Sequence, residues 1–327
     1  MHELVRDLVR EEAAAPLLAR LPLDDGALIA AFATRGAAPL WVAKTAYGES
    51  ACRRLRAEAA ALERLAPLAL TLNLPRRLAW REGGSGAGTH ACLVQSAVAG
   101  KQRPCVWNAD HPWAELPGVL SAAANWLRRF QRLAGSEALG LHLPAWPDLV
   151  EQVCADAARD RQQNPEWASL LAALPPPGEA ALRSAVVHGD FWAGNVLWQP
   201  PWRAGVVDWS GLSAGSALDD LLTFTSNLTC GGAGRVWTRL GCWQALWFSP
   251  GRPREFLRGW AREAGYSNAD ARCAFYVFLL RRLRWELGLG LQTRNREDRL
   301  RAVRDWSAVV AWLAQQRFPD PFTPMSL

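Results

Sequence analysis

The first hundred residues carry short apolar runs separated by turn-forming residues. Runs at residues 28–34 and 40–44 flank a Gly-Ala-Ala-Pro turn, which predicts a β-hairpin with Lys44 at the end of its second strand. Residues 77–80 and 91–96 indicate two further strands around a glycine-rich loop. This part of the chain therefore predicts a small antiparallel sheet.

Between these strands, residues 50–65 have the period of a helix. Leu55, Ala59 and Leu62 recur at spacings of three and four and form one apolar face. Glu58 lies on the same face, where a carboxylate is unfavourable unless it is paired, and Lys44 on the adjoining strand is the expected partner. The whole chain has only two lysines, so we expect a specific reason for a lysine here.

The composition changes near residue 100. Beyond this point the pattern predicts helices at residues 119–133, 146–158 and 165–174, and several more after residue 217. A length of 327 residues agrees with two compact units. We therefore expect an α+β chain with a sheet domain at residues 1–100 and a mainly helical domain at residues 101–327.

Three polar side chains follow short apolar strands in the second half of the chain. Asp190 and Asn195 share one loop after residues 185–187, and Asp208 ends the strand that should pair with the one after Asn195. These residues are expected to surround one small volume. Carboxylate and amide oxygens suit Mg²⁺ far better than zinc or copper, so the sequence predicts a magnesium site.

These motifs together resemble the aminoglycoside phosphotransferase and choline kinase superfamily. The resemblance rests on the His-Gly-Asp-x-x-x-x-Asn run, the later Val-Asp-Trp, the strand lysine and the helix glutamate, and it spans roughly residues 20–300. It implies a two-lobed protein-kinase-like fold. Residues 1–100 would then form the nucleotide-binding lobe, and residues 101–327 the catalytic and acceptor-binding lobe.

The resemblance also implies an ATP- and Mg²⁺-dependent transfer of the γ-phosphate to a hydroxyl group of a small molecule. In that reaction one residue accepts or orients the hydroxyl proton, two hold Mg²⁺, and others bind ATP. The resemblance assigns the catalytic role to Asp190 and the metal to Asn195 and Asp208. It places Lys44 at the α- and β-phosphates, with Glu58 holding Lys44 in place. Gln95 and Ser96 would lie in the segment that receives adenine.

Two positions depart from the family pattern. The stretch at residues 21–26 holds one glycine and two acids where the family usually has a glycine-bearing phosphate loop. Ser210 stands where many relatives carry a second acid near the metal. These departures keep one alternative open, a pseudokinase-like module that binds a nucleotide or a partner without transfer.

Other polar residues near the motifs are expected to be structural. His188 should bond to the backbone and fix its loop rather than act as a base. Asp220 should cap the first turn of a helix, and Ser267 with Asp270 should form a capping box. Most of the 18 tryptophans should fill the core. Those beyond residue 235 leave a second possibility, an aromatic cage that binds a choline-like cation.

The overall composition excludes several classes of protein. Apolar residues make up 50% and charged residues 21%, as in ordinary folded domains. No apolar run approaches the roughly 18 residues of a membrane span, and the first ten residues lack the order of a secretion signal, so we expect a cytoplasmic protein. The seven cysteines show no Cys-x-x-Cys spacing, which argues against zinc and disulfide frameworks.

The net charge of +6 is concentrated near the C-terminal end. Residues 221–327 contain 16 arginines and 8 acidic residues. This excess is electrostatically wrong for a polycationic aminoglycoside, so we favour a sugar, a sugar phosphate or a similar metabolite as the acceptor. An arginine-rich proteome explains the excess equally well. Few aromatic residues alternate with these arginines, which argues against nucleic acid binding.

Overall fold

The computed structural model describes most of the chain. The described residues are 17–23, 26–35, 38–84, 88–102, 106–108, 116–135, 144–160, 170, 172, 184–200, 203–232, 235–236, 238–288, 296–316 and 319–322. Two parts of the sequence analysis lie outside them: Asp24 and Asp25, in the stretch that departs from the family's phosphate loop, and nearly all of the helix expected at residues 165–174.

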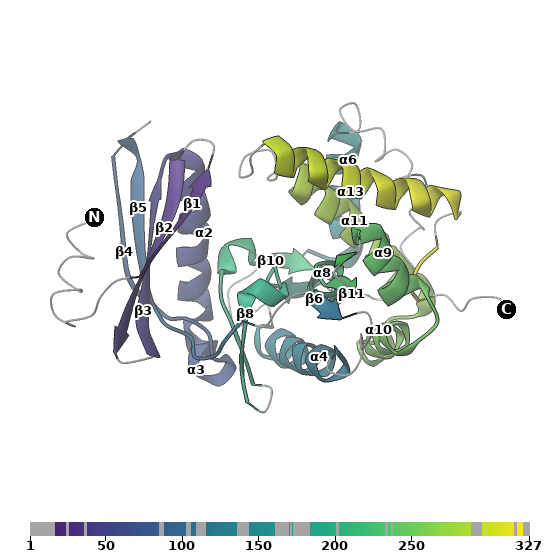
Figure 1. Ribbon diagram of the computed structural model, residues 1–327, viewed down its shortest axis with the longest axis horizontal. Coiled ribbons are helices and arrows are strands. Elements are labelled where there is room, and N and C mark those ends of the chain that lie inside the picture. Colours follow the sequence, from purple (N-terminus) through teal and green to yellow (C-terminus); the bar gives the residue numbers. More distant parts are fainter. Residues whose placement is uncertain are drawn as a thin grey trace.

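The N-terminal lobe is a five-stranded antiparallel sheet with a helix packed on one face (Figure 1). The strand order is β1-β2-β3-β5-β4. The predicted Lys44 position is wrong by three residues, because β3 continues to Tyr47 and Lys44 lies inside the strand. The elements are β1 (Leu17–Leu23), β2 (Gly26–Arg35), β3 (Ala38–Tyr47), β4 (Arg77–Gly83), β5 (His90–Ser96), the helix α2 (Glu49–Leu65), the 3₁₀ turn η1 (Ala66–Leu68) and α3 (Ala69–Leu72).

Helix α2 forms where the apolar period predicted it. Its buried face includes Leu55, Ala59 and Leu62, and this face packs against the sheet and against the loop that follows Asp208. Burial of each leucine side chain contributes about 1.5–3 kcal/mol, so the amphipathic pattern is sufficient to fix the helix on the sheet. Glu58 is buried on the same face.

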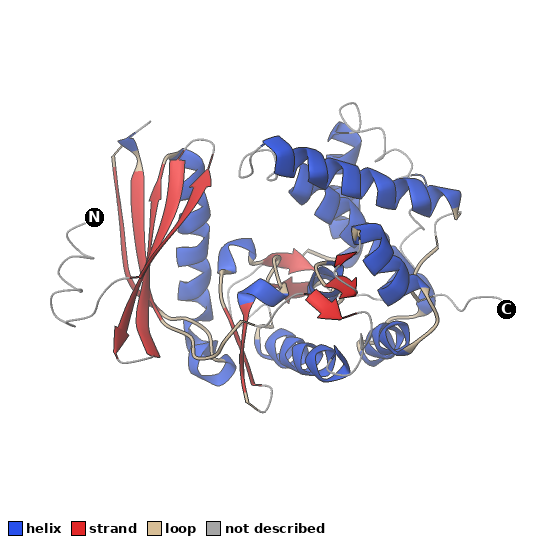
Figure 2. Ribbon diagram, viewed as in Figure 1, coloured by secondary structure: helices blue, strands red, loops and turns tan. Residues whose placement is uncertain are grey.

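The C-terminal lobe is mainly helical, with short strands among the helices (Figure 2). Strands β7 and β10 pair, as do β8 and β9, and β6, β11 and β12 form a third small sheet. The elements are β6 (Val106–Asn108), α4 (Leu116–Leu133), α6 (Trp146–Asp160), β7 (Ala185–Val187), η3 (Ala193–Asn195), β8 (Val196–Gln199), β9 (Arg203–Val206), η4 (Trp209–Gly211), β10 (Ser213–Gly215), α8 (Asp219–Ser226), β11 (Thr229–Gly232), β12 (Arg235–Val236), α9 (Arg239–Trp243), the π-helical turn η5 (Gln244–Phe248), α10 (Arg252–Glu263), α11 (Asn268–Gly288) and α13 (Arg296–Gln315).

Tryptophans of the C-terminal lobe fill its core. Trp243, Trp247 and Trp260 are almost fully buried, and the first two rings lie 4.2 Å apart between centroids. They therefore do not form an open cage for a choline-like cation, and the core interpretation is confirmed for them. Ser267 and Asp270 form the predicted capping box, since each accepts a hydrogen bond from the backbone N–H of the other.

The prediction of an α+β fold in two lobes is confirmed. The boundary near residue 100 stays a prediction. None of the described helices is long and apolar enough to cross a membrane.

Candidate active site

Lys44 and Glu58 form the ion pair that the sequence predicted. The Lys44 ammonium lies 2.6 and 2.7 Å from the two carboxylate oxygens of Glu58, and both side chains are largely buried. Burial alone would lower the pKa of Lys44, but the carboxylates of Glu58 and Asp208 outweigh burial and raise this pKa above its ordinary value. Lys44 is therefore a fixed cation at the face of the N-terminal sheet.

Asp190 and Asn195 lie together in the loop after β7. The Asn195 amide nitrogen donates to the Asp190 backbone carbonyl at 2.9 Å and to its carboxylate at 3.3 Å. On its other side, the Asp190 carboxylate is 3.5 Å from the Arg282 guanidinium of α11. Burial raises the pKa of Asp190, and Arg282 opposes this shift.

Asp208 follows β9 and adopts a left-handed backbone conformation, with φ 64° and ψ 69°. This conformation is costly for a residue other than glycine and is typical of functional sites. One Asp208 carboxylate oxygen is 3.8 Å from the Lys44 ammonium, and the other is 3.5 Å from the Arg54 guanidinium of α2. Burial would raise the pKa of Asp208, but Lys44 and Arg54 reverse that effect and lower the pKa below its ordinary value.

His188 fixes the loop, as predicted. The Asp190 backbone N–H donates to His188 Nδ1 at 3.2 Å, and His188 Nε2 donates to the Val207 carbonyl at 3.0 Å. These bonds require a neutral imidazole. The ring is fully buried, and burial lowers the pKa of His188 to about 4. His188 therefore ties the loop of Asp190 to the strand that leads to Asp208.

We expect a measurable pH dependence of stability from His188. The imidazole is neutral in the folded protein down to a pKa of about 4, whereas in the unfolded chain it binds a proton below 6.5. Its contribution is therefore complete above pH 6.5 and is lost as the pH falls toward 4, by about 3 kcal/mol. The unfolding free energies of wild type and His188→Gln, measured by urea titration, should differ most at neutral pH. A pH-independent difference between them would contradict this assignment.

Asp220 has a structural role, but the prediction of its partners is wrong. It makes no capping bond to its own helix α8. Its two carboxylate oxygens instead accept the backbone N–H groups of His188 at 2.7 Å and Gly189 at 3.0 Å. Gly189 has φ 82°, and a Cβ there would lie 2.2 Å from the Gly211 carbonyl oxygen, so only glycine fits this turn. Asp220 therefore holds the tight turn that precedes Asp190.

The donor set fits Mg²⁺. The Asn195 amide nitrogen bonds to Asp190, which leaves the amide oxygen available to a cation, and Asp208 would add a carboxylate oxygen. Among the residues that the structure describes, no group of three or more His, Cys, Asp or Glu could hold a metal. Mg²⁺ characteristically takes one or two protein ligands and completes its shell with water and phosphate oxygens. The hydroxyl of Ser210 donates to Asp208 at 3.4 Å.

A model of the phosphotransferase enzyme family (APH) matches residues 21–276, well over half of the chain. The chain belongs to this family. It is therefore a phosphotransferase that acts on an alcohol group, and the resemblance seen in the motifs is confirmed.

Solved structures of phosphotransferases share the fold over nearly their whole length. A thermostable mutant of aminoglycoside phosphotransferase APH(4)-Ia, in a ternary complex with ADP and hygromycin B, is 17% identical, with a TM-score of 0.53 and coverage of 95% of this chain and 98% of that one. Macrolide 2'-phosphotransferase MphH from Brachybacterium faecium is 16% identical (TM-score 0.51; coverage 93% and 97%). Aminoglycoside-3'-phosphotransferase of type VIII is 23% identical (TM-score 0.52; coverage 86% and 99%). No curated protein matches the sequence.

Two predicted nucleotide-binding residues lie on β5. Gln95 pairs with Val42 across the strands, and Lys44 pairs with Leu93, so Gln95 and Lys44 share one face of the sheet. The Gln95 amide oxygen is buried without a hydrogen-bond partner in the described part of the chain. Ser96 is at the end of the strand, where its backbone N–H donates to the Arg76 carbonyl and its hydroxyl accepts from the Arg76 N–H. The adenine role of both residues stays a prediction.

The sequence patterns do not indicate two arginines of this candidate site. Arg54 precedes Glu58 by four residues, which places both on one side of α2, and this spacing could have indicated it. Arg282 lies in the arginine-rich part of the sequence, where nothing distinguishes it from its neighbours. Its contact with Asp190 joins residues 92 positions apart, and no local pattern predicts such a contact.

Proposed function

We propose that this phosphotransferase transfers the γ-phosphate of ATP, in the presence of Mg²⁺, to a hydroxyl group of a small molecule. The observation that carries the proposal is the meeting of the two lobes, where the Lys44 ammonium of the sheet lies 3.8 Å from the Asp208 carboxylate. A cation held by Glu58 thus lies beside the predicted metal ligand. A donor triphosphate requires this combination of charges.

Residues of the N-terminal lobe would bind the donor. Lys44 would contact the α- and β-phosphates, and Glu58 would hold it in place. The Arg54 guanidinium lies 3.5 Å from Asp208 and would supply a second cation beside the phosphates. This cation would compensate for the stretch at residues 21–26, which has only one glycine where the family usually has a glycine-bearing phosphate loop. Gln95 would accept a hydrogen bond from the adenine amino group, which would satisfy its buried amide oxygen.

Residues of the C-terminal lobe would perform the transfer. Asp190 would accept or orient the proton of the attacking hydroxyl, while Asn195 and Asp208 would hold the metal. When bound, Mg²⁺ supplies charge neutralisation for the donor phosphates. Asp220 and His188 would keep the Asp190 loop in one conformation, so that the carboxylate does not reorganise during the reaction.

The acceptor class follows from the charges beside Asp190. A cavity of about 140 Å³ reaches Gly189, and the charged residues that line it are two acids, Asp219 and Asp220, and two arginines, Arg281 and Arg282. Each is paired, Arg281 with Asp219 and Arg282 with Asp190, so the arginine excess is smaller here than the sequence indicates. The charges of the lining residues balance, so the cavity lacks the net negative charge that a polycation requires. A neutral or anionic acceptor, such as a sugar or a sugar phosphate, is therefore favoured over an aminoglycoside.

Release of ADP from Mg²⁺-ATP tests the proposal. The assay would screen aminoglycosides, macrolides, sugars, sugar phosphates, amino alcohols and nucleosides, with Asp208→Ala as the blank. We expect acceptor-dependent ADP release that the blank lacks. Nucleotide binding without ADP release from any acceptor would instead favour the pseudokinase-like alternative, and a hit confined to aminoglycosides would overturn the acceptor preference.

A further inference from the structure

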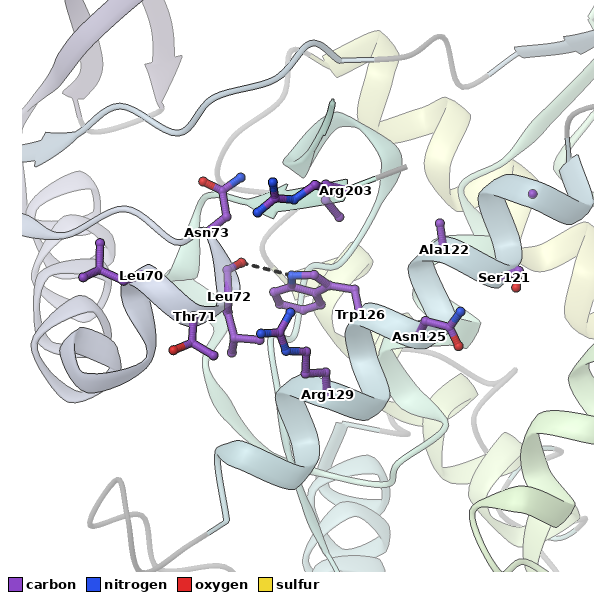
Figure 3. Close-up of a pocket in the computed structure, with 12 residues that line it drawn as sticks. Leu70, Thr71, Leu72, Asn73, Ser121, Ala122, Asn125, Trp126, Arg129 and Arg203 are labelled. Atoms are coloured by element: carbon purple, nitrogen blue, oxygen red, sulfur yellow. Dashed lines mark hydrogen bonds between the residues drawn. The ribbon is translucent and has the colours of Figure 1, made fainter. Parts of the chain in front are cut away.

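A second cavity in the described part of the chain lies outside the active site. It has a volume of about 470 Å³ and is bounded by α3 with the following Asn73, by α4 and by β9 (Figure 3). None of the residues that line it takes part in the proposed reaction. Its size is in the range of sites for small metabolites.

The polar groups around this cavity are cationic or neutral. Arg129 of α4 and Arg203 of β9 extend toward the same space from two walls (Figure 3), and no Asp or Glu is among the lining residues. Within the described residues, neither arginine forms an ion pair. Asn73, Asn125 and Ser121 add amide and hydroxyl groups at the walls. Two guanidinium groups that extend into one cavity, and that no carboxylate of the described residues neutralises, favour an anion.

The back wall of the cavity is rigid. The Trp126 indole N–H donates to the Leu72 carbonyl at 3.2 Å, which joins α4 to the end of α3 (Figure 3). The indole also stacks on Phe130 and Phe191, with ring centroids 5.3 and 5.5 Å apart. The wall therefore exists before a ligand arrives, and little ordering free energy is lost on binding.

The rim carries an apolar side chain that lacks a covering neighbour. Leu70 is 85% exposed, the largest exposed fraction among the bulky apolar residues described. A ligand with an apolar part beside its charged group would cover it. The cavity thus combines solvent-exposed cationic groups at its walls with an apolar edge.

We propose that this cavity is a binding site for a small organic phosphate, distinct from the nucleotide and acceptor sites. Arg129 and Arg203 bind the phosphate group, because the planar guanidinium group matches phosphate oxygens in a bidentate geometry. Asn73 and Asn125 donate to the remaining oxygens, and Leu70 contacts the apolar part of the ligand. The site takes its walls from both lobes, since α3 belongs to the N-terminal lobe and α4 and β9 to the C-terminal lobe.

Calorimetric titration with inorganic pyrophosphate, without added metal, tests this site. We expect saturable binding that is weakened about tenfold or more in Arg129→Ala/Arg203→Ala. The matched control is Arg64→Ala/Arg132→Ala, which removes two charges from exposed positions outside the cavity. Arg54→Ala serves as the control for binding at the nucleotide site. The first control should bind as tightly as wild type, and Arg54→Ala should weaken only binding at the nucleotide site and leave the component that Arg129→Ala/Arg203→Ala weakens unchanged.

The outcomes separate the two sites without reference to catalysis. Absence of saturable binding at millimolar pyrophosphate would overturn the proposal, as would binding that Arg54→Ala weakens and Arg129→Ala/Arg203→Ala does not. Equal weakening by both double variants would show only general electrostatic attraction and would overturn it as well. Since Arg129 and Arg203 are exposed, their variants should have the wild-type thermal unfolding midpoint, and each single variant repeats the test.

Discussion

Replacement of Asp190 by asparagine is expected to lower kcat about 10²- to 10⁴-fold and to leave the KM for ATP nearly unchanged. Asparagine has the same shape and can still lie between Asn195 and Arg282, which contact the carboxylate at 3.3 and 3.5 Å. It has no negative charge with which to accept the proton of the attacking hydroxyl. The loss should therefore affect the transfer step and not nucleotide binding, as steady-state kinetics with varied ATP would show.

The matched control for this experiment is Asp156→Asn. Asp156 also pairs with an arginine of α11, Arg284, but it lies on α6 and takes no part in the proposed reaction. Its variant should keep wild-type turnover. If Asp190→Asn transferred phosphate at the wild-type rate, the proposed proton acceptor would be wrong, because a carboxylate would not be needed at that position.

The parts of the fold that the sequence predicted are those set by local patterns. The apolar period of α2, the alternating runs of the N-terminal strands and the capping box before α11 each depend on residues a few positions apart. Asp190, Asn195 and Asp208 were predicted together because each follows a short strand and because their spacing resembles a known family. The proximity of Asp208 to Lys44 is a tertiary contact that the resemblance, and not the spacing, predicted.

The remaining features depend on packing between distant segments. Arg282 reaches Asp190 only because α11 passes behind the loop, and Asp220 bonds to His188 and Gly189 only because α8 begins beside that turn. The acidic start of a helix looks the same in sequence whether the carboxylate caps its own helix or another loop. The sequence also does not show which arginines of α11 form ion pairs. The net charge of residues 221–327 therefore suggests more unpaired arginines near the acceptor than the structure contains.

The Lys44–Glu58 pair provides a second large effect, on stability as well as on activity. Glu58→Gln is expected to lower the free energy of unfolding by about 3–5 kcal/mol, because the buried Lys44 ammonium loses its carboxylate partner. The double variant Lys44→Met/Glu58→Leu removes both charges and keeps apolar side chains of similar length. It should unfold within about 1–2 kcal/mol of wild type, since apolar replacement of a complete buried pair is often neutral or stabilising. Urea titration measures both differences.

The same double variant decides whether the pair is functional or only structural. If Lys44 binds the donor phosphates, the double variant should be as stable as wild type and yet have lost most of its nucleotide affinity and its turnover. If the pair serves the fold alone, the double variant should recover both stability and activity, and the donor role of Lys44 would be wrong. We expect the first result, because the Lys44 ammonium lies 3.8 Å from Asp208 on the opposite lobe, and a lysine that served only its own sheet has no need to approach a second carboxylate.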